Sequence, residues 1–141
     1  MGVIDPQLVE VLAYTGEGYR PLVDYGEWRV AILRYIDELT PENITFVERH
    51  KETDEVFVLL DGCCVLLLTD DENKVYAVDM EPQKIYNIKQ GVFHSHVLSE
   101  DATILIVENR DTSHENSERL TLTEEQRMQI QALLVETSYR N

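Results

Sequence analysis

Basic side chains are scarce in this sequence, with 12 Lys and Arg against 27 Asp and Glu, so the formal net charge is −15. Nucleic acid and anionic membrane surfaces would repel such a chain, and we exclude both as partners. The acidity is best explained by a solvated protein surface, and attraction of cations is a minor addition to that role.

Cysteine is limited to the adjacent pair Cys63 and Cys64. Neighbouring residues of a strand point to opposite faces, so this pair predicts neither a structural disulfide nor two ligands for one zinc ion. We expect both residues to act as small apolar side chains in a reduced compartment.

Long apolar segments are also lacking. The longest run, CCVLLL, is too short to span a bilayer. The N-terminal residues MGVIDPQLVEVLAY contain no basic segment followed by an apolar core, and so do not form a secretory signal. These features predict a cytoplasmic protein.

Motifs of nucleotide and hydrolase chemistry are missing from the sequence. It contains no Gly-rich phosphate loop, no nucleotide-binding motif and no nucleophile constellation, which argues against kinases, dehydrogenases and triad hydrolases. We therefore expect no nucleotide or flavin cofactor.

What the sequence does contain is a series of short β-forming segments. Its 141 residues suit a single domain, and 43% hydrophobic with 28% charged residues is ordinary for a folded soluble protein. Turn residues recur every eight to twelve positions or so, which favours an all-β antiparallel barrel or sandwich over alternating strands and helices. The predicted strands are residues 28–36, 44–50, 55–60, 63–69, 75–80, 84–88, 92–98 and 103–109.

Two helices are predicted outside these strands. Asp5 and Pro6 can begin a short N-terminal helix over residues 7–13. Thr123 and Gln126 form a capping-box pattern ahead of a C-terminal helix over residues 124–138, whose apolar face would pack against the barrel or a second subunit. The polar residues 110–119 between the barrel and this helix predict a surface excursion.

Polar side chains interrupt the apolar face of two predicted strands. In the first, Glu48 and His50 share a face with Ile44 and Phe46, because alternate strand residues point the same way. In the next, Glu55 shares a face with Phe57 and Leu59. Carboxylates and an imidazole that point into an apolar interior are costly unless something binds them.

The spacing of these residues resembles the two sequence motifs of the cupin superfamily. His50-x4-Glu55-x6-Gly62 is similar to the second half of the first motif, and Gly91-x-x-His94 to part of the second. The resemblance covers about residues 28–109 and implies a cupin double-stranded β-helix, also called a jelly-roll barrel. The run WRVAIL…TDEVFVLL…LIVENRDTS is also similar to small bacterial cupins grouped loosely with ureidoglycolate-processing proteins.

The resemblance implies a divalent metal in the barrel mouth. In cupins two His and one Glu of the first motif and one His of the second hold the ion, which assigns His50, Glu55 and His94 here. The sequence departs from the pattern at Glu48, which replaces the first His, and at Lys89 and Leu98, which replace a Pro and an Asn. Carboxylate and imidazole ligands suit manganese, ferrous iron, nickel or zinc, and Glu48 would be a fourth ligand.

Each candidate ligand also has a simpler interpretation that needs no metal. Glu48 can be solvated or paired with a base such as Arg34, His50 can be hydrogen-bonded to a neighbouring carboxylate, and Glu55 can accept backbone hydrogen bonds. His96 shares a face with His94 and is a core residue, a substrate contact or an extra ligand. His114 is expected to be exposed and without a role.

Three functions remain compatible with the sequence. The first is a metal-dependent enzyme, a lyase, isomerase or hydrolase that acts on a small carboxylate, sugar or ureido compound, with Glu48 or His96 transferring protons. The second is a metal-free barrel that binds a small metabolite. The third is a structural or interaction protein whose C-terminal helix pairs subunits. We expect a small-molecule ligand and a homodimer.

Overall fold

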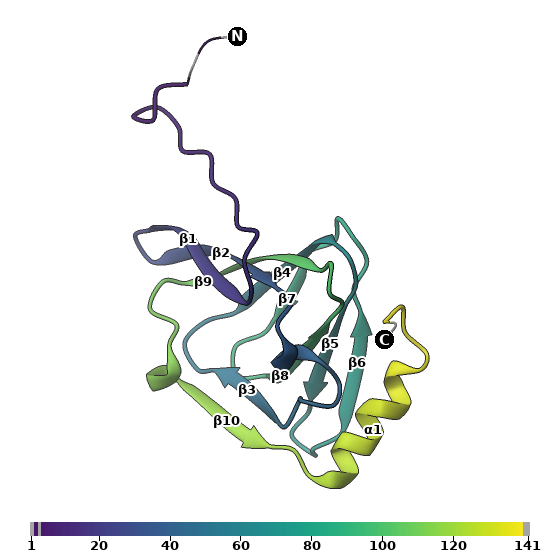
Figure 1. The fold of residues 1–141 in the computed structure, drawn as a ribbon. Coiled ribbons are helices and arrows are strands. Elements are labelled where there is room, and N and C mark those ends of the chain that lie inside the picture. Colours follow the sequence, from purple (N-terminus) through teal and green to yellow (C-terminus); the bar gives the residue numbers. More distant parts are fainter. Residues whose placement is uncertain (1, 3, 140–141) are drawn as a thin grey trace.

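The computed structural model describes residue 2 and residues 4–139, and folds them into two antiparallel β-sheets that face each other (Figure 1). The first sheet has the strand order β1 (Tyr19–Tyr25), β2 (Trp28–Arg34), β9 (Thr103–Asn109), β4 (Glu55–Asp61), β7 (Tyr86–Ile88). The second has the order β10 (Ser117–Thr121), β3 (Phe46–His50), β8 (Phe93–Leu98), β5 (Cys64–Thr69), β6 (Val75–Asp79). This all-β jelly-roll architecture confirms the fold class predicted from the sequence.

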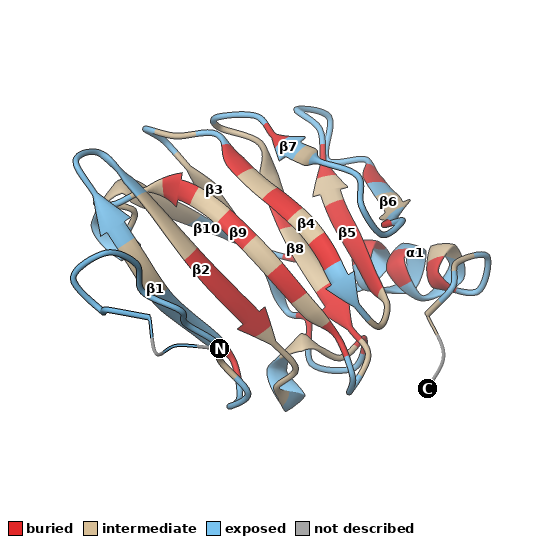
Figure 2. Cartoon of the chain, turned by 90° about the horizontal axis from the view of Figure 1, so that it is seen from above, coloured by how far each residue is buried: buried red, intermediate tan, exposed pale blue. Residues whose placement is uncertain are grey.

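Side-chain alternation along the strands separates two apolar clusters. The first lies between the sheets and takes inward residues from both, among them Leu33, Phe57, Leu66 and Ile104. The second lies on the outer side of the second sheet and includes Val47 and Val65. Figure 2 shows the alternation as red and tan segments along β9 and β4, whereas β2 is buried continuously from Ala31 to Leu33. Apolar side chains therefore fill the space between the sheets and also cover the outer side of the second sheet.

The C-terminal helix α1 (Glu124–Leu134) covers the outer side of the second sheet. Thr123 accepts a hydrogen bond from the Gln126 amide, and the Gln126 side chain accepts one from the Thr123 amide, as the capping-box pattern predicts. Ile130 and Leu134 are buried against the outer cluster, and the helix lies along β6. The helix ends four residues earlier than predicted. No helix in residues 4–139 is long and apolar enough to cross a bilayer.

The N-terminal helix predicted for residues 7–13 is wrong. These residues are all described, and they form only a turn at 6–8 followed by an extended segment that runs away from the sheets (Figure 1). Leu8 and Val11 are 82% and 81% exposed, so no packing stabilises a helix there. An isolated helix of this length is marginal in water, and Val9 and Val11 lower its propensity further.

The segment 110–119 is more ordered than the predicted surface excursion. It contains the short 3₁₀ helix η2 (His114–Asn116) and the start of β10, which pairs with β3 from Ser117 opposite His50 to Thr121 opposite Phe46. A second 3₁₀ helix, η1 (Asp37–Leu39), links β2 to β3. Strands β1 and β10 also extend the sheets beyond the barrel limits of 28–109 expected from the sequence.

Candidate metal centre

Three of the four predicted ligands meet inside one end of the barrel. His50 is the last residue of β3, Glu55 is the first residue of β4, and His94 lies near the start of β8. β3 and β8 are neighbours in the second sheet, whereas β4 belongs to the first. The two imidazoles therefore face the carboxylate across the barrel interior.

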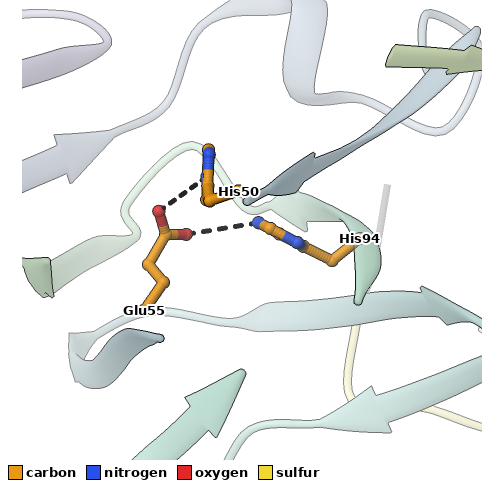
Figure 3. Close-up of side chains that lie close together, drawn as sticks. All are labelled: His50, Glu55 and His94. Carbon is orange, nitrogen blue, oxygen red and sulfur yellow. Dashed lines mark ion pairs between the residues drawn. The ribbon is translucent and has the colours of Figure 1, made fainter. Parts of the chain in front are cut away.

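The carboxylate of Glu55 bridges the two imidazoles (Figure 3). His50 Nε2 lies 3.0 Å from Glu55 Oε2, and His94 Nε2 lies 3.3 Å from Glu55 Oε1. The side chains of His50, Glu55 and His94 are 11%, 7% and 5% exposed. One ligand atom from each of the three residues lies within 4.8 Å of the other two. The three groups form a compact, nearly buried cluster.

The outer ring nitrogens of both imidazoles have separate partners. His50 Nδ1 lies 2.9 Å from Ser117 Oγ on β10, and His94 Nδ1 lies 3.0 Å from the carbonyl oxygen of Val92. A carbonyl only accepts hydrogen bonds, so His94 Nδ1 carries the proton when the ring is neutral. In that tautomer His94 Nε2 has a free lone pair that a metal ion can bind, whereas a hydrogen bond from Nε2 to Glu55 requires the ring to be protonated on both nitrogens.

The close contacts shift the protonation of the cluster. Burial alone would lower the pKa of His50, but the hydrogen bond and charge of Glu55 outweigh it and raise that pKa. Burial alone would raise the pKa of Glu55, but the hydrogen bonds from His50 and His94 hold it well below its usual range. Glu55 is therefore ionised.

A second buried carboxyl group, Glu108, extends the cluster along the first sheet. It is inward-facing on β9, opposite Arg29 of β2, and lies within hydrogen-bonding reach of Glu55. Arg29 Nη2 and the Tyr19 hydroxyl each donate to Glu108 Oε1 at 2.6 Å. Burial, together with the hydrogen bond and charge of Glu55, raises the pKa of Glu108 to about 7. Tyr19, Arg29, Glu108 and Glu55 thus form a polar row across the barrel wall.

Glu48 lies beside this cluster but outside it. It is the cross-strand partner of His94, and its side chain faces the cavity as the strand pattern predicts. Its carboxylate accepts a hydrogen bond from Arg119 Nε of β10 at 2.9 Å, and His114 Nδ1 is 3.9 Å away. The pairing with Arg34 considered from the sequence is wrong: Glu48 pairs with Arg119, and Arg34 donates a hydrogen bond to Thr103 instead.

His96 lies two residues further along β8, on the same face as His94, as the strand alternation predicts. Its ring stacks edge-on against Phe57, with centroids 5.5 Å apart. Burial, and next the proximity of His94, lower the pKa of His96 to about 4, so its ring is neutral at physiological pH. His96 Nδ1 is buried without a hydrogen-bond partner in the described part of the chain.

A cavity of about 480 Å³ connects these groups to the barrel mouth. Apolar side chains form much of its wall: Leu33, Ile36, Leu39, Phe46, Phe57 and Ile106. Hydroxyl and charged groups gather at its mouth: Glu48, Thr112, Ser113, His114, Ser117 and Arg119. His114 is exposed, as expected, although it lies at this rim. The volume suits a small metabolite.

The site includes residues that the sequence reading missed. Glu108 follows the inward positions Ile104 and Ile106 on β9, the same signal that revealed Glu48 and His50, so it could have been found. Ser117 and Arg119 could not, because their segment carries no strand pattern and reaches the site only through pairing with β3.

The donor set fits a divalent transition metal. Two imidazole nitrogens and a carboxylate converge from three strands, and the other nitrogen of each imidazole has its own hydrogen-bond partner, as is usual for metal-bound His. Ligand atoms about 2.1 Å from a common ion lie at most about 4.2 Å apart, so only small side-chain rotations separate the cluster from a metal-holding arrangement.

Structural comparison identifies the architecture. A variant of Bacillus subtilis oxalate decarboxylase matches 75% of this chain with a TM-score of 0.57 and 15% identity, and a Lactobacillus farciminis oxalate decarboxylase–formate complex matches 74% with a TM-score of 0.52 and 16% identity. This chain spans only 29% and 32% of those proteins. A protein from Planctomyces limnophilus matches 82% of this chain and 94% of its own, with a TM-score of 0.51 and 15% identity.

Sequence comparison adds no closer relative. No protein-family model and no curated protein matches the chain. The similarity to ureidoglycolate-processing proteins therefore remains a prediction from the sequence. The structural neighbours and the motif residues nevertheless agree on the architecture: the fold of this chain is that of the cupin superfamily.

Proposed function

We propose that this protein binds a divalent metal ion through His50, Glu55 and His94 and uses it to hold a small oxygen-rich metabolite in the barrel cavity. The observation that carries the proposal is the convergence of the three side chains on one point, with the far nitrogen of each imidazole already engaged. A divalent ion at that point would act as a Lewis acid on a carboxylate, carbonyl or hydroxyl oxygen.

The remaining polar groups of the cavity have distinct roles in this proposal. Glu55 supplies the negative charge that neutralises the cation, and Ser117 and the Val92 carbonyl hold the imidazole planes. His96, neutral and with a free Nδ1, forms a hydrogen bond to the bound metabolite and can exchange a proton with it. Glu48 exchanges a proton with the metabolite at the cavity mouth once its hydrogen bond with Arg119 breaks, or binds the metal as a fourth ligand.

If the protein is an enzyme, these groups suit a lyase, isomerase or hydrolase that acts on a small carboxylate, sugar or ureido compound. Each of these reactions needs an oxygen polarised by the ion and one group that moves a proton. The cavity volume of about 480 Å³ lies within the range of sites that bind small molecules.

One observation favours a metal-free binding protein as the second candidate. Glu55 already accepts hydrogen bonds from both imidazoles, so the buried charge is satisfied without a cation. In that case the cavity would hold its ligand through His96, Ser117 and Arg119 alone, with no chemistry.

Elemental analysis of protein purified without a His tag separates the candidates. We expect close to one equivalent of Mn, Fe, Ni or Zn in the wild type, and loss of the metal in His50→Ala and His94→Ala. His114→Ala is the matched control, because this exposed His lies at the same rim and should leave the metal content unchanged. A metal-free wild type that also fails to take up added metal, but is stabilised by small carboxylates or sugars in a thermal-shift assay, would establish the second candidate instead.

A further inference from the structure

The first sheet carries a row of polar side chains on its inner face. The strand pairing places Arg29 of β2 opposite Glu108 of β9. Val56 of β4 pairs with Val107 of β9, so the next step of the same antiparallel register places Glu55 opposite Glu108. The row therefore crosses three neighbouring strands, and its side chains all line the cavity: Arg29, Glu108 and Glu55.

Two carboxyl groups side by side in this row need an explanation. Like charges directly opposite each other on a sheet are destabilising, and a buried charge is costly without a partner. The side chains of Glu108 and Glu55 are only 4% and 7% exposed, so water screens their charges little. They nevertheless lie within hydrogen-bonding reach of each other. One of the two carboxyl groups must therefore supply the hydrogen atom of that bond.

The other contacts of the two groups indicate that the donor is Glu108. Glu55 faces imidazole nitrogens at 3.0 Å and 3.3 Å, which favours its ionised form, and an ionised carboxylate only accepts hydrogen bonds. In Glu108 the accepting oxygen is Oε1, since the Tyr19 hydroxyl and Arg29 Nη2 both donate to it at 2.6 Å. This leaves Glu108 Oε2 to carry the hydrogen atom and donate it to Glu55.

An ion in the cluster would change the contacts that Glu55 can keep. Its two oxygens now face His50 Nε2 and His94 Nε2, and both nitrogens would bind the ion instead. One Glu55 oxygen would bind the ion as well, and the other would lose its imidazole partner. Glu108 can still donate to that oxygen, because it approaches along the first sheet from β9. Carboxylates that bind metals are usually held by such a hydrogen bond.

We propose that Glu108 is a positioning residue of the metal site, whose carboxyl group donates a hydrogen bond to Glu55 and fixes the orientation of that ligand toward the ion. Tyr19 and Arg29 act through Glu108 by holding its other oxygen. Among the described residues, the ligand atoms within 4.8 Å of one another belong to His50, Glu55 and His94, which leaves Glu108 outside the ligands. This role rests on the metal binding proposed above.

The metal affinity of full-chain variants tests the proposal, with Zn²⁺ as the probe in competition with a chromogenic chelator at one fixed pH. Glu108→Ala removes the donor and should weaken Zn²⁺ binding by about 10–100-fold, the usual effect of losing an outer contact of a ligand. Glu108→Gln should bind Zn²⁺ within about threefold of the wild type, because its amide nitrogen can donate the same hydrogen bond to Glu55. Tyr19→Phe removes one of the two donors to Glu108 Oε1 and should weaken binding about fivefold.

Two controls separate positioning from lost stability and from direct ligation. Ile104→Val shortens another inward side chain of β9, which belongs to the apolar core, so it should lower the melting temperature but leave the Zn²⁺ affinity unchanged. The visible absorption spectrum of the Co²⁺-loaded protein reports the ligands of the ion, and Glu108→Gln should keep the wild-type spectrum.

The outcomes distinguish this role from the proposed function. A wild type that binds neither Zn²⁺ nor Co²⁺ would overturn the metal site, and the role of Glu108 with it. If the wild type binds Zn²⁺, the positioning role alone is overturned by wild-type affinity in Glu108→Ala, or by a Glu108→Gln as weak as Glu108→Ala. A changed Co²⁺ spectrum in Glu108→Gln, or an Ile104→Val as weak as Glu108→Ala, overturns it as well. If Glu108→Ala does not fold, Tyr19→Phe decides, and an unchanged affinity in that variant rejects the role.

Discussion

Removal of the Glu55 carboxylate should destabilise the metal-free protein far more than removal of its neighbour Glu48. Glu55 is almost fully buried and accepts hydrogen bonds from His50 at 3.0 Å and His94 at 3.3 Å. In Glu55→Ala both imidazoles lose their partner although their side chains are only 11% and 5% exposed. Loss of one member of a buried ion pair costs about 3–5 kcal/mol.

One effect opposes that loss. The charge of Glu55 contributes to the raised pKa of Glu108, so its removal lets Glu108 ionise more easily beside Arg29 and Tyr19. A change of one pKa unit is worth about 1.4 kcal/mol, which leaves a net destabilisation of about 3 kcal/mol. At about 3 °C per kcal/mol for a chain of this length, the melting temperature should fall by about 9 °C.

Glu48→Ala is the matched control for this substitution. Glu48 also accepts a hydrogen bond from a base, but Arg119 is half-exposed, with 52% of its side-chain surface accessible. Exposed ion pairs contribute about 0–1 kcal/mol, so the melting temperature should fall by about 3 °C or less. Both variants are unfolded in excess chelator, once by heating followed by circular dichroism and once by urea titration. Equal melting temperatures for the two variants would refute the view that Glu55 is the electrostatic centre of the site.

Three further predictions concern metal binding, a tight turn and a surface carboxylate. Added Zn²⁺ at about 100 times its dissociation constant should stabilise the wild type by about 2.7 kcal/mol, or about 8 °C by differential scanning fluorimetry, and His94→Ala should lose this response. Gly62→Ala should lower the free energy of unfolding in urea by about 3 kcal/mol, because Gly62 has φ +74° and a Cβ there would lie 2.6 Å from Ala102 Cα. Gly26→Ala is the control: with φ +58° and no atom within 4 Å of the added Cβ, it should lower that free energy by about 1 kcal/mol. A backbone hydrogen bond from Lys74 lowers the pKa of Asp70. The ionised Asp70 carboxylate therefore stabilises the fold above its unfolded-state pKa of about 3.9, and this stabilisation is lost as the pH falls. Asp70→Asn should therefore melt below the wild type at neutral pH and approach it in acid.

Local side-chain periodicity was enough to predict most of the barrel. Turn residues bounded the strands to within one or two positions, as for the predicted strand 103–109, which is β9. Alternation predicted that Glu48, His50 and Glu55 would point inward, and that His94 and His96 would share a face. These predictions hold because the side-chain period of a strand is a property of the backbone and needs no knowledge of distant residues. The N-terminal helix failed because helix formation depends on packing that residues 7–13 do not have.

Only the tertiary structure decided which inward groups meet. Glu48 and His50 leave the same strand on the same face, yet His50 joins Glu55 while Glu48 is drawn to Arg119 from a segment that looked like a surface loop. Glu108 and Glu55 are neighbours because β4 pairs with β9 across some fifty residues of intervening chain. The periodicity of a strand determines the direction of a side chain, but its partner depends on which strands lie side by side, and that is settled by the packing of the whole barrel.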